Sequence, residues 1–259
     1  MGKEYPIPFS AANYRAWFHP GQNRTKSGRK GGLPYAYLCR VSPRAGIVVF
    51  PGSNCDRDLY YALERAGFRP QYLWHADTAL PPLEAVFLPG GFSYGDYLRP
   101  GAIARFSQII PAIEDFWREG GFVMGICNGF QILVEAGWLP GALLRNQSGR
   151  FICSVTTIVP QLTSEHPLAS YLEARPYRLP IAHGDGRYVV AGNEIPFHRF
   201  RYVPAAPNGS QHHIAGVINT EGTVLGLMPH PERACDPYQG HSDGLDFLRA
   251  IARYVNDRS

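Results

Sequence analysis

The chain has 259 residues, of which 45% are hydrophobic and 18% are charged, a composition that can build one α/β domain with an ample core. It contains no stretch of about 18 consecutive apolar residues and no apolar signal-peptide core, so we expect neither a membrane span nor a secreted protein. Five irregularly spaced cysteines without a Cys-x-x-Cys pair indicate neither a disulfide framework nor a zinc site, and we expect a cytoplasmic protein with free thiols.

The net charge of +4 is concentrated in residues 1–45, which hold eight of the 25 Lys and Arg residues but only one acid. The rest of the chain is slightly acidic, so the charge gives no reason to expect nucleic-acid binding. The segment is rich in Gly and Pro, and we expect a disordered or loosely attached extension before a single domain at 46–259. An upstream start codon or an expression artefact would explain it. An organelle-targeting segment or a docking arm are the alternatives.

From residue 46 onward, apolar runs alternate with amphipathic segments. A helix is expected from an N-cap at Asp56 through Ala66, where Gly67 ends it, and another over 109–119. The predicted strands cover 47–50, 71–74, 85–88, 122–124, 151–159, 188–190, 214–218 and 224–228. A helix over 243–254 closes the chain. This order predicts an α/β fold, an open and mostly parallel flavodoxin-like sheet flanked by helices, with an additional β-rich segment after Leu144.

A Pro-Gly-Gly sequence follows the predicted strand at 85–88. Amide groups in glycine turns are free to face a ligand, and acyl transfer needs N–H donors where the oxyanion develops. We therefore expect one oxyanion donor at Gly91 or its immediate neighbour. Such turns are common, so this prediction depends on the two motifs that follow it in the chain.

Residues 122–131 (FVMGICNGFQ) contain the most informative motif. An apolar strand leads into a turn with Cys127 between Gly125 and Gly129, which is the strand–turn–helix pattern of a nucleophile elbow with sulfur in place of the usual hydroxyl. The dipole of the helix that follows favours a thiolate. We predict that Cys127 is a nucleophile and that the N–H of Asn128 is the second oxyanion donor. The alternative is a small buried core residue.

The predicted strand at 224–228 leads into Pro-His-Pro-Glu-Arg. Pro231 favours an extended conformation of His230, and residues two apart in an extended segment point the same way. Glu232 could therefore orient His230, and His230 could hold the proton of Cys127. The order Cys, His, acid matches that of enzymes with a nucleophile elbow. By itself, the motif fits a solvated turn equally well.

Four segments with polar or reactive groups each follow a predicted strand. They are 51–54, 89–91, Cys127 and His230. In open parallel sheets, ligands bind beyond the carboxyl ends of the strands, so we expect these segments to meet at one edge. Gln131 is one helical turn beyond Cys127 and should face the same direction.

These residues resemble the class I, triad-type glutamine amidotransferases. The resemblance extends from Ala45 to about Asn256, and within the class it is to the glutaminase subunits of phosphoribosylformylglycinamidine synthases. The matching motifs are 50–56 (FPGSNCD), 90–99 (GGFSYGDYLR), 127–131 (CNGFQ), 182–184 (AHG) and 228–233 (MPHPER). Two departures concern partner contacts rather than chemistry: Asp185 replaces an expected glutamate, and the segment 196–206 is irregular.

The resemblance implies a glutaminase with Cys127, His230 and Glu232 as its triad, and with L-glutamine held by Gly90, Phe92 and Gln131. It also implies that ammonia passes to a large synthase subunit, with a small accessory subunit in the same complex. That synthase would convert formylglycinamide ribonucleotide to its amidine with ATP and magnesium. No phosphate-binding loop of the Gly-x-x-x-x-Gly-Lys-[Ser/Thr] type occurs here, so we expect no cofactor and no metal in this chain.

Several alternatives remain open at this level. The same triad would serve a γ-glutamyl or peptide hydrolase, and a regulatory subunit could retain an inherited site. Cys55 is interpreted as a structural or rim residue in preference to a second nucleophile, and Cys153 as a core residue. His183 either lines the pocket or turns the chain.

Overall fold

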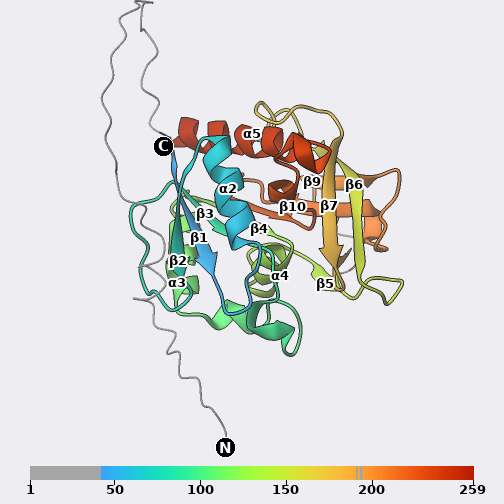
Figure 1. The fold of residues 1–259 in the computed structure, drawn as a ribbon, viewed down its shortest axis with the longest axis horizontal. Helices are drawn as coiled ribbons and strands as arrows, with labels where there is room; N and C mark the ends of the chain where they lie inside the picture. The colour runs from blue at the N-terminus through green and yellow to red at the C-terminus, as the bar shows by residue number, and fades with distance from the viewer. Residues whose placement is uncertain (1–41, 191, 193–194) are drawn as a thin grey trace, which may run out of the picture. The chain divides into compact units, whose positions relative to one another are not determined.

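A nine-stranded sheet runs through the part of the chain that the computed structural model describes, residues 42–190, 192 and 195–259. Its strand order is β2-β1-β3-β4-β11-β10-β9-β6-β7 (Figure 1). The five strands from β2 to β11 pair in parallel. Their bounds are β1 Arg44–Val49, β2 Arg69–Trp74, β3 Ala85–Leu88, β4 Phe122–Ile126 and β11 Val224–Leu227.

The other half of the sheet is antiparallel. It consists of β10 Ile214–Ile218, β9 Arg199–Val203, β6 Ile152–Gln161 and β7 Tyr177–His183, and a separate short pair joins β5 Ala142–Leu144 to β8 Arg187–Val189. The predicted α/β fold is confirmed. The β-rich segment extends the main sheet, which is therefore mixed to a greater degree than expected.

Helices lie on both faces of the parallel half, as its fully buried central strands β3, β4 and β11 require. They are α2 Asp56–Ala66, α3 Ile109–Arg118, α4 Asn128–Glu135 and α5 Asp243–Arg258. Phe122 of β4 packs edge-on against Tyr254 of α5. On the opposite face of β4, Gly125 lies against Gly129 of α4. The strand therefore separates α4 from α5.

Two elements differ from the sequence-based expectation. Strand β9 lies in the segment 196–206, which was expected to be irregular, and its alternation places Phe200 and Tyr202 in the core. Strand β7 was not predicted because Pro180 interrupts its pattern, yet a proline is tolerated in a strand at the sheet edge, where β7 lies. The N-cap of α2 is Cys55 and not Asp56.

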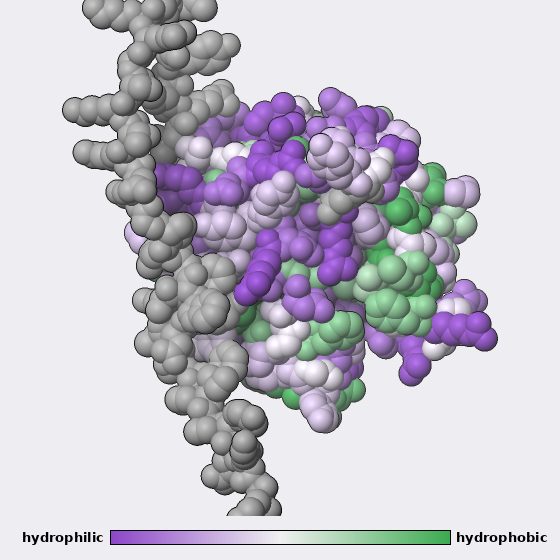
Figure 2. Space-filling view, viewed as in Figure 1, coloured by the Kyte–Doolittle hydropathy of each residue, from purple (hydrophilic) through white to green (hydrophobic). Residues whose placement is uncertain are grey.

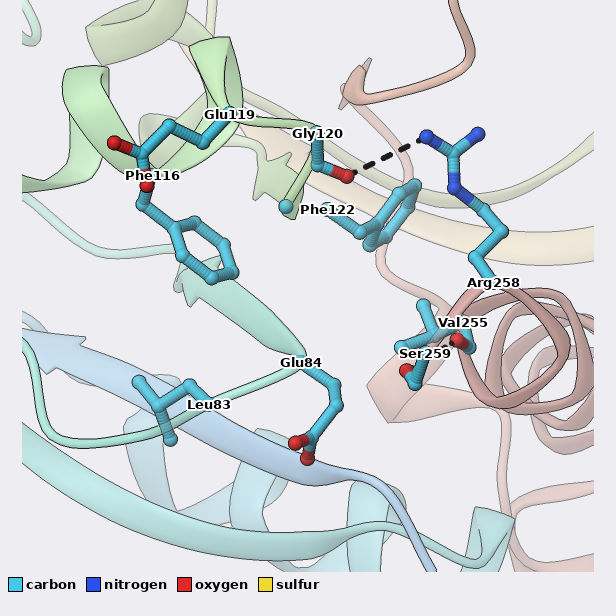
Figure 3. Close-up of a pocket in the computed structure, with 10 residues that line it drawn as sticks. Leu83, Glu84, Phe116, Glu119, Gly120, Phe122, Val255, Arg258 and Ser259 are labelled. Carbon is cyan, nitrogen blue, oxygen red and sulfur yellow. Dashed lines mark hydrogen bonds between the residues drawn. The ribbon is translucent and has the colours of Figure 1, made fainter.

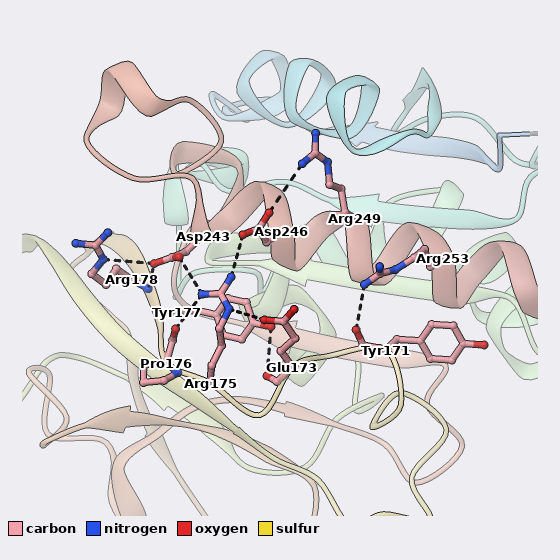
Figure 4. A network of polar contacts seen from close by, with 10 residues as sticks. All are labelled: Tyr171, Glu173, Arg175, Pro176, Tyr177, Arg178, Asp243, Asp246, Arg249 and Arg253. Carbon is pink, nitrogen blue, oxygen red and sulfur yellow. Dashed lines mark hydrogen bonds and ion pairs between the residues drawn. The ribbon is translucent and has the colours of Figure 1, made fainter.

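An arginine-centred network fixes β7 against α5. Arg175, just before β7, binds Asp243 and Asp246 in the first turn of α5 at 2.9 Å each and Glu173 at 2.8 Å (Figure 4). The Arg178 N–H donates to the Asp243 carboxylate at 2.9 Å. These contacts hold the free edge of β7 in place, and that edge borders the site described below.

The surface differs between the two halves of the sheet. Hydrophilic residues cover α2 and α5, whereas hydrophobic residues gather over β6 and β7 (Figure 2). Phe151 and Val155 are exposed there. No helix in the described residues has the length and apolar character needed to cross a membrane.

The expected extension at 1–45 lies almost entirely outside the described residues. Strand β1 begins at Arg44, two residues before the predicted domain start. The Arg44 N–H and guanidinium both donate to the Glu84 carboxylate at the start of β3. The domain boundary that we propose therefore lies before Arg44.

A chain that begins at Ser42 keeps every strand pairing of the described sheet, and we expect it to fold with the melting temperature of the full chain. A chain that begins at Ala45 lacks Arg44 and leaves Glu84 unpaired, so we expect a lower melting temperature. Thermal unfolding followed by circular dichroism compares the two. Equal values for the two shortened chains would contradict a stabilising role of the Arg44–Glu84 pair.

Candidate active site

Cys127 lies on a strained turn between β4 and α4. Its backbone angles are φ 51° and ψ −105°, a left-handed conformation that costs a non-glycine residue of the order of 1–3 kcal/mol. The Cys127 N–H donates to the Leu227 carbonyl of β11 at 2.8 Å. Close packing of α4 on the sheet enforces the turn, because a β-carbon at Gly129 would lie 2.0 Å from the Leu88 carbonyl oxygen.

His230 and Glu232 form a buried pair beyond the end of β11. The His230 Nδ1 and Glu232 Oε1 atoms are 2.6 Å apart, and both side chains are almost fully buried. His230 is extended, as predicted, but Glu232 lies in the 3-10 turn Pro231–Arg233. The pair therefore meets through a tight turn and not along an extended segment.

The surroundings of His230 define its chemistry. The Glu232 carboxylate accepts from Nδ1, so the proton for exchange is at Nε2, which has no hydrogen-bond partner among the described residues. Burial opposes the charged form, but Glu232 and Cys127 outweigh it and hold the pKa of His230 well above its ordinary value. The raised pKa favours the charged form of the ring beside Cys127, which is the form that can donate a proton.

The free edge of β7 borders this group. The His230 N–H donates to the Pro180 carbonyl at 2.8 Å, and the Cys127 sulfur lies 3.8 Å from the Ala182 carbonyl oxygen. Two backbone groups of one edge strand therefore position the proposed base and the proposed nucleophile.

The Pro-Gly-Gly loop reaches the same edge. The N–H groups of Phe92, Ser93 and Tyr94 donate to Gly52, Asn128 and Pro51. That leaves the amides of Gly90 and Gly91 as the candidate oxyanion donors of this loop. Gly91 has a φ of 153° and bridges to Ser53, so the loop also meets the segment 51–54, as predicted.

Asn128 and Gln131 are linked to each other. The Asn128 side-chain N–H donates to Gln131 Oε1 at 2.9 Å, and Gln131 Nε2 donates to the Asp185 carbonyl at 2.7 Å. Both side chains are buried. Gln131 therefore connects α4 to the segment after β7, and the role of this side chain as a direct glutamine contact stays a prediction.

Sequence reasoning did not identify a pair of acids beside these amides. Asp96 lies 3.4 Å from the Asn128 side-chain nitrogen, and burial together with the charge of Asp185 raises the pKa of Asp96 to about 6. The segment is strained, since Tyr94, Asp96 and Leu98 all have positive φ. Asp96 and Asp185 are far apart in the sequence, so their positions gave no sign that the two carboxylates influence each other.

The structure places three residues that the sequence left open. Cys55 is buried and its sulfur lies close to His230, so it is not a rim residue. Cys153, expected in the core, is exposed on β6. His183 is the buried last residue of β7, its Nδ1 lies 3.0 Å from Asn146 Oδ1, and burial lowers its pKa to about 4. Its role in the pocket stays a prediction.

A hollow of about 430 Å³ lies at the other end of the parallel strands, where β3 and β4 begin. Its lining includes Glu84 before β3, Phe122 at the start of β4 and Arg258 at the end of α5 (Figure 3). Glu84 binds Arg44 and Arg258 donates to the Gly120 carbonyl. The residues that line this hollow include no cysteine and no histidine, so it offers none of the reactive groups found around Cys127.

Comparison with known proteins agrees with this geometry. Residues 42–244 match the family described as the CobB/CobQ-like glutamine amidotransferase domain. The chain is 50% identical over 221 residues to phosphoribosylformylglycinamidine synthase subunit PurQ of Moorella thermoacetica, covering 80% of this chain and 94% of the relative. It is also 50% identical over 218 residues to the protein of the same name from Rubrobacter xylanophilus, covering 80% and 97%.

Solved structures give the same picture. A chain in the structure of PurLQS from Thermotoga maritima is 48% identical and superposes with a TM-score of 0.77, covering 83% of this chain and all of the other. A glutamine amidotransferase from Thermotoga maritima, at 16% identity and a TM-score of 0.52, shares the fold over 83% of this chain and 98% of the other.

We expect Glu232→Gln to lower the pKa of His230 from above its ordinary value to below it, because burial then acts without the opposing carboxylate. The carboxylate of the wild type favours the protonated imidazole, and its removal should favour the neutral one. NMR titration of the ring, assigned by comparison with His230→Gln, measures this. An unchanged pKa would contradict the assignment of Glu232 as the group that charges His230.

Proposed function

The chain belongs to the family of phosphoribosylformylglycinamidine synthase subunits PurQ, within the CobB/CobQ-like glutamine amidotransferases, and we propose that it hydrolyses L-glutamine through Cys127, His230 and Glu232. The ammonia serves the ATP-dependent conversion of formylglycinamide ribonucleotide to formylglycinamidine ribonucleotide in de novo purine biosynthesis. The observation that supports this most strongly is the strained Cys127 turn beside the buried pair of His230 and Glu232, whose facing atoms are 2.6 Å apart.

The reaction that we propose has two halves. The Cys127 thiolate attacks the side-chain amide carbon of glutamine, and His230 gives its Nε2 proton to the departing ammonia, which leaves a thioester. His230, now neutral, takes a proton from water, which attacks the thioester and releases glutamate. Glu232 keeps the ring oriented and stabilises its charged form in both halves.

The oxyanion of each half is assigned to the backbone N–H groups of Gly91 and Asn128. One such donor lowers the barrier by about 3–4 kcal/mol. The Asn128 N–H is the first of α4, where an intrahelical acceptor is lacking and the helix dipole favours negative charge. Gly90, Phe92 and Gln131 are proposed to contact the glutamine, and the hydrogen bond from Gln131 Nε2 to the Asp185 carbonyl positions the Gln131 side chain.

The proposed partners are a large synthase subunit, in which ATP and magnesium act, and a small accessory protein of the same complex. A segment next to the Pro-Gly-Gly loop supports a partner surface there. Tyr97 and Leu98 are 75% and 92% exposed. Neighbouring exposed aromatic and apolar side chains favour an interface. The same segment contains the positive-φ residues, and strained segments are typical of switches.

A hydrolase of γ-glutamyl peptides is the competing function, since it would use the same three residues. The two proposals differ in substrate and in dependence on a partner. Turnover of γ-glutamyl peptides at a rate above that of glutamine would favour the hydrolase.

We expect Cys127→Ala to lower glutamine hydrolysis by about three orders of magnitude or more, because the covalent bond cannot form. Glu232→Gln should cost less than Cys127→Ala, because Glu232 orients the base and forms no covalent bond to the substrate. Cys153→Ala, an exposed cysteine, is the matched control and should retain full activity.

Steady-state release of glutamate measures the three variants. In the assembled synthase, Cys127→Ala should still use free ammonium, since the proposed acceptor site is in another subunit. Wild-type glutamine turnover by Cys127→Ala would refute the assignment.

We expect the isolated chain to be a poor glutaminase, and its complex with the synthase partner and nucleotide substrates to be a good one. A partner that binds at Tyr97 and Leu98 could turn the Gly91 N–H toward the oxyanion, and one donor accounts for activation of about a hundredfold or more. Glutamate release with and without the partner tests this. Equal rates would argue for a stand-alone hydrolase.

A further inference from the structure

Cys55 is a second thiol next to the imidazole of His230. A β-carbon built on Gly90 would lie 3.0 Å from the Cys55 sulfur and 2.7 Å from His230 Cε1. The two side chains therefore approach one point from different elements, the N-cap of α2 and the end of β11. The Cys55 N–H donates to the Gly90 carbonyl at 3.2 Å, which fixes this approach.

Three potential ligand atoms converge at this point. One atom each from Cys55, His230 and Glu232 lie within 4.8 Å of one another, and all three residues are buried. The second carboxylate oxygen of Glu232 and Nε2 of His230 have no hydrogen-bond partner among the described residues. A thiolate, an imidazole and a carboxylate are a ligand set that zinc takes.

We propose that Cys55, His230 and Glu232 bind a thiophilic divalent cation of the zinc type, and that the bound ion switches off the glutaminase. The second half of this proposal depends on the function proposed above, whereas the first does not. Zinc bonds of about 2.0–2.3 Å separate tetrahedral ligand atoms by roughly 3.3–3.7 Å. The ligand atoms lie within 4.8 Å of one another, and His230 Nδ1 and Glu232 Oε1 are 2.6 Å apart, so binding requires shifts of about an ångström in these side chains.

Charge and proton balance favour such an ion. The Cys55 thiolate and the Glu232 carboxylate together neutralise a divalent cation. Metal binding displaces the thiol proton of Cys55, which leaves to solvent. His230 also gives up one proton, because its ring nitrogen must offer a lone pair to the metal.

Arg233 lies between Cys55 and solvent. Its Nη2 donates to the Cys55 sulfur at 3.0 Å and its Nε donates to Asp58 at 3.3 Å. The Arg233 side chain is 33% exposed, so its displacement gives an ion a path to the sulfur. In the bound state, the same N–H group can donate to the metal thiolate, as outer-shell donors do.

Occupation of this site must stop catalysis whichever ring nitrogen binds. A metal at Nε2 takes the place of the proton that His230 gives to the departing ammonia. A metal at Nδ1 replaces the hydrogen bond to Glu232 and rotates the ring. The sequence gave no sign of this site, because Cys55 is far from His230 and Glu232 in the chain.

The direct test measures Zn²⁺ binding to the full chain in a Cys127→Ala background, so that the nucleophile contributes no thiolate. We expect one Zn²⁺ per chain by calorimetry, and with Cd²⁺ the ultraviolet charge-transfer band of a thiolate complex. Adding Cys55→Ser should weaken binding by about tenfold or more and remove the band, whereas Cys153→Ser, on an exposed cysteine, should change neither.

Cys55→Ala provides a second ligand deletion, and thermal unfolding checks that both variants fold. Equal affinity and an equal band with and without the Cys55 thiol would overturn the site. The activity test then asks whether Zn²⁺ inhibits glutamate release reversibly with EDTA, and whether Cys55→Ser raises the inhibition constant about tenfold or more.

Equal inhibition of the wild type and Cys55→Ser would overturn the inhibitory role. If glutamine hydrolysis itself were absent, the binding measurement in the Cys127→Ala background would still decide the metal site. The failure of the proposed function and the failure of this inference are therefore distinguishable.

Discussion

The close approach of α4 to the sheet is the constraint on which the site depends. A β-carbon at Gly129 would lie 2.0 Å from the Leu88 carbonyl oxygen, and one at Gly226 would lie 1.9 Å from the ring of Phe130. With these two β-carbons absent, the helix packs directly on β3 and β11, and the chain must turn sharply between β4 and α4. Cys127 occupies that turn with a positive φ. Packing energy in the core thus sustains the strained turn that places the proposed nucleophile beyond the carboxyl end of β4.

Burial strengthens the electrostatic interactions between the site residues at the carboxyl ends of the strands. His230 and Glu232 are almost fully buried, and a hydrogen bond between them is stronger in such surroundings than in water. The same surroundings make an unpaired charge costly, so the two residues depend on each other. Cys127 and Cys55 both influence the pKa of His230, so one imidazole interacts with two thiols. The proposed catalytic step uses the first thiol, and the proposed inhibitory metal site uses the second.

The part of the site that is local in sequence could be predicted, and the part that depends on distant contacts could not. The Cys127 turn follows from a strand, two glycines and a helix within about ten residues. Cys55 lies next to His230, and Asp96 next to Asp185, because loops that follow different strands meet there. The positions of these residues in the sequence do not indicate that they are in proximity. Strand β9 was missed although Phe200 and Tyr202 alternate with arginines, which is a readable signal. Strand β7 gave a weaker one, because Pro180 breaks its pattern. Strands β6 and β10 were therefore predicted, whereas β7, β9 and the antiparallel order that joins all four came from the structure alone.

The central claim is that Cys127, and no other thiol, attacks the glutamine side chain. Intact-mass and peptide mass spectrometry of the full chain after reaction with the glutamine analogue 6-diazo-5-oxo-L-norleucine tests it most directly. We expect one adduct per chain, located on Cys127 and suppressed by excess L-glutamine, with Cys55 unmodified. An adduct on Cys55, or labelling of Cys127 that glutamine does not suppress, would contradict it.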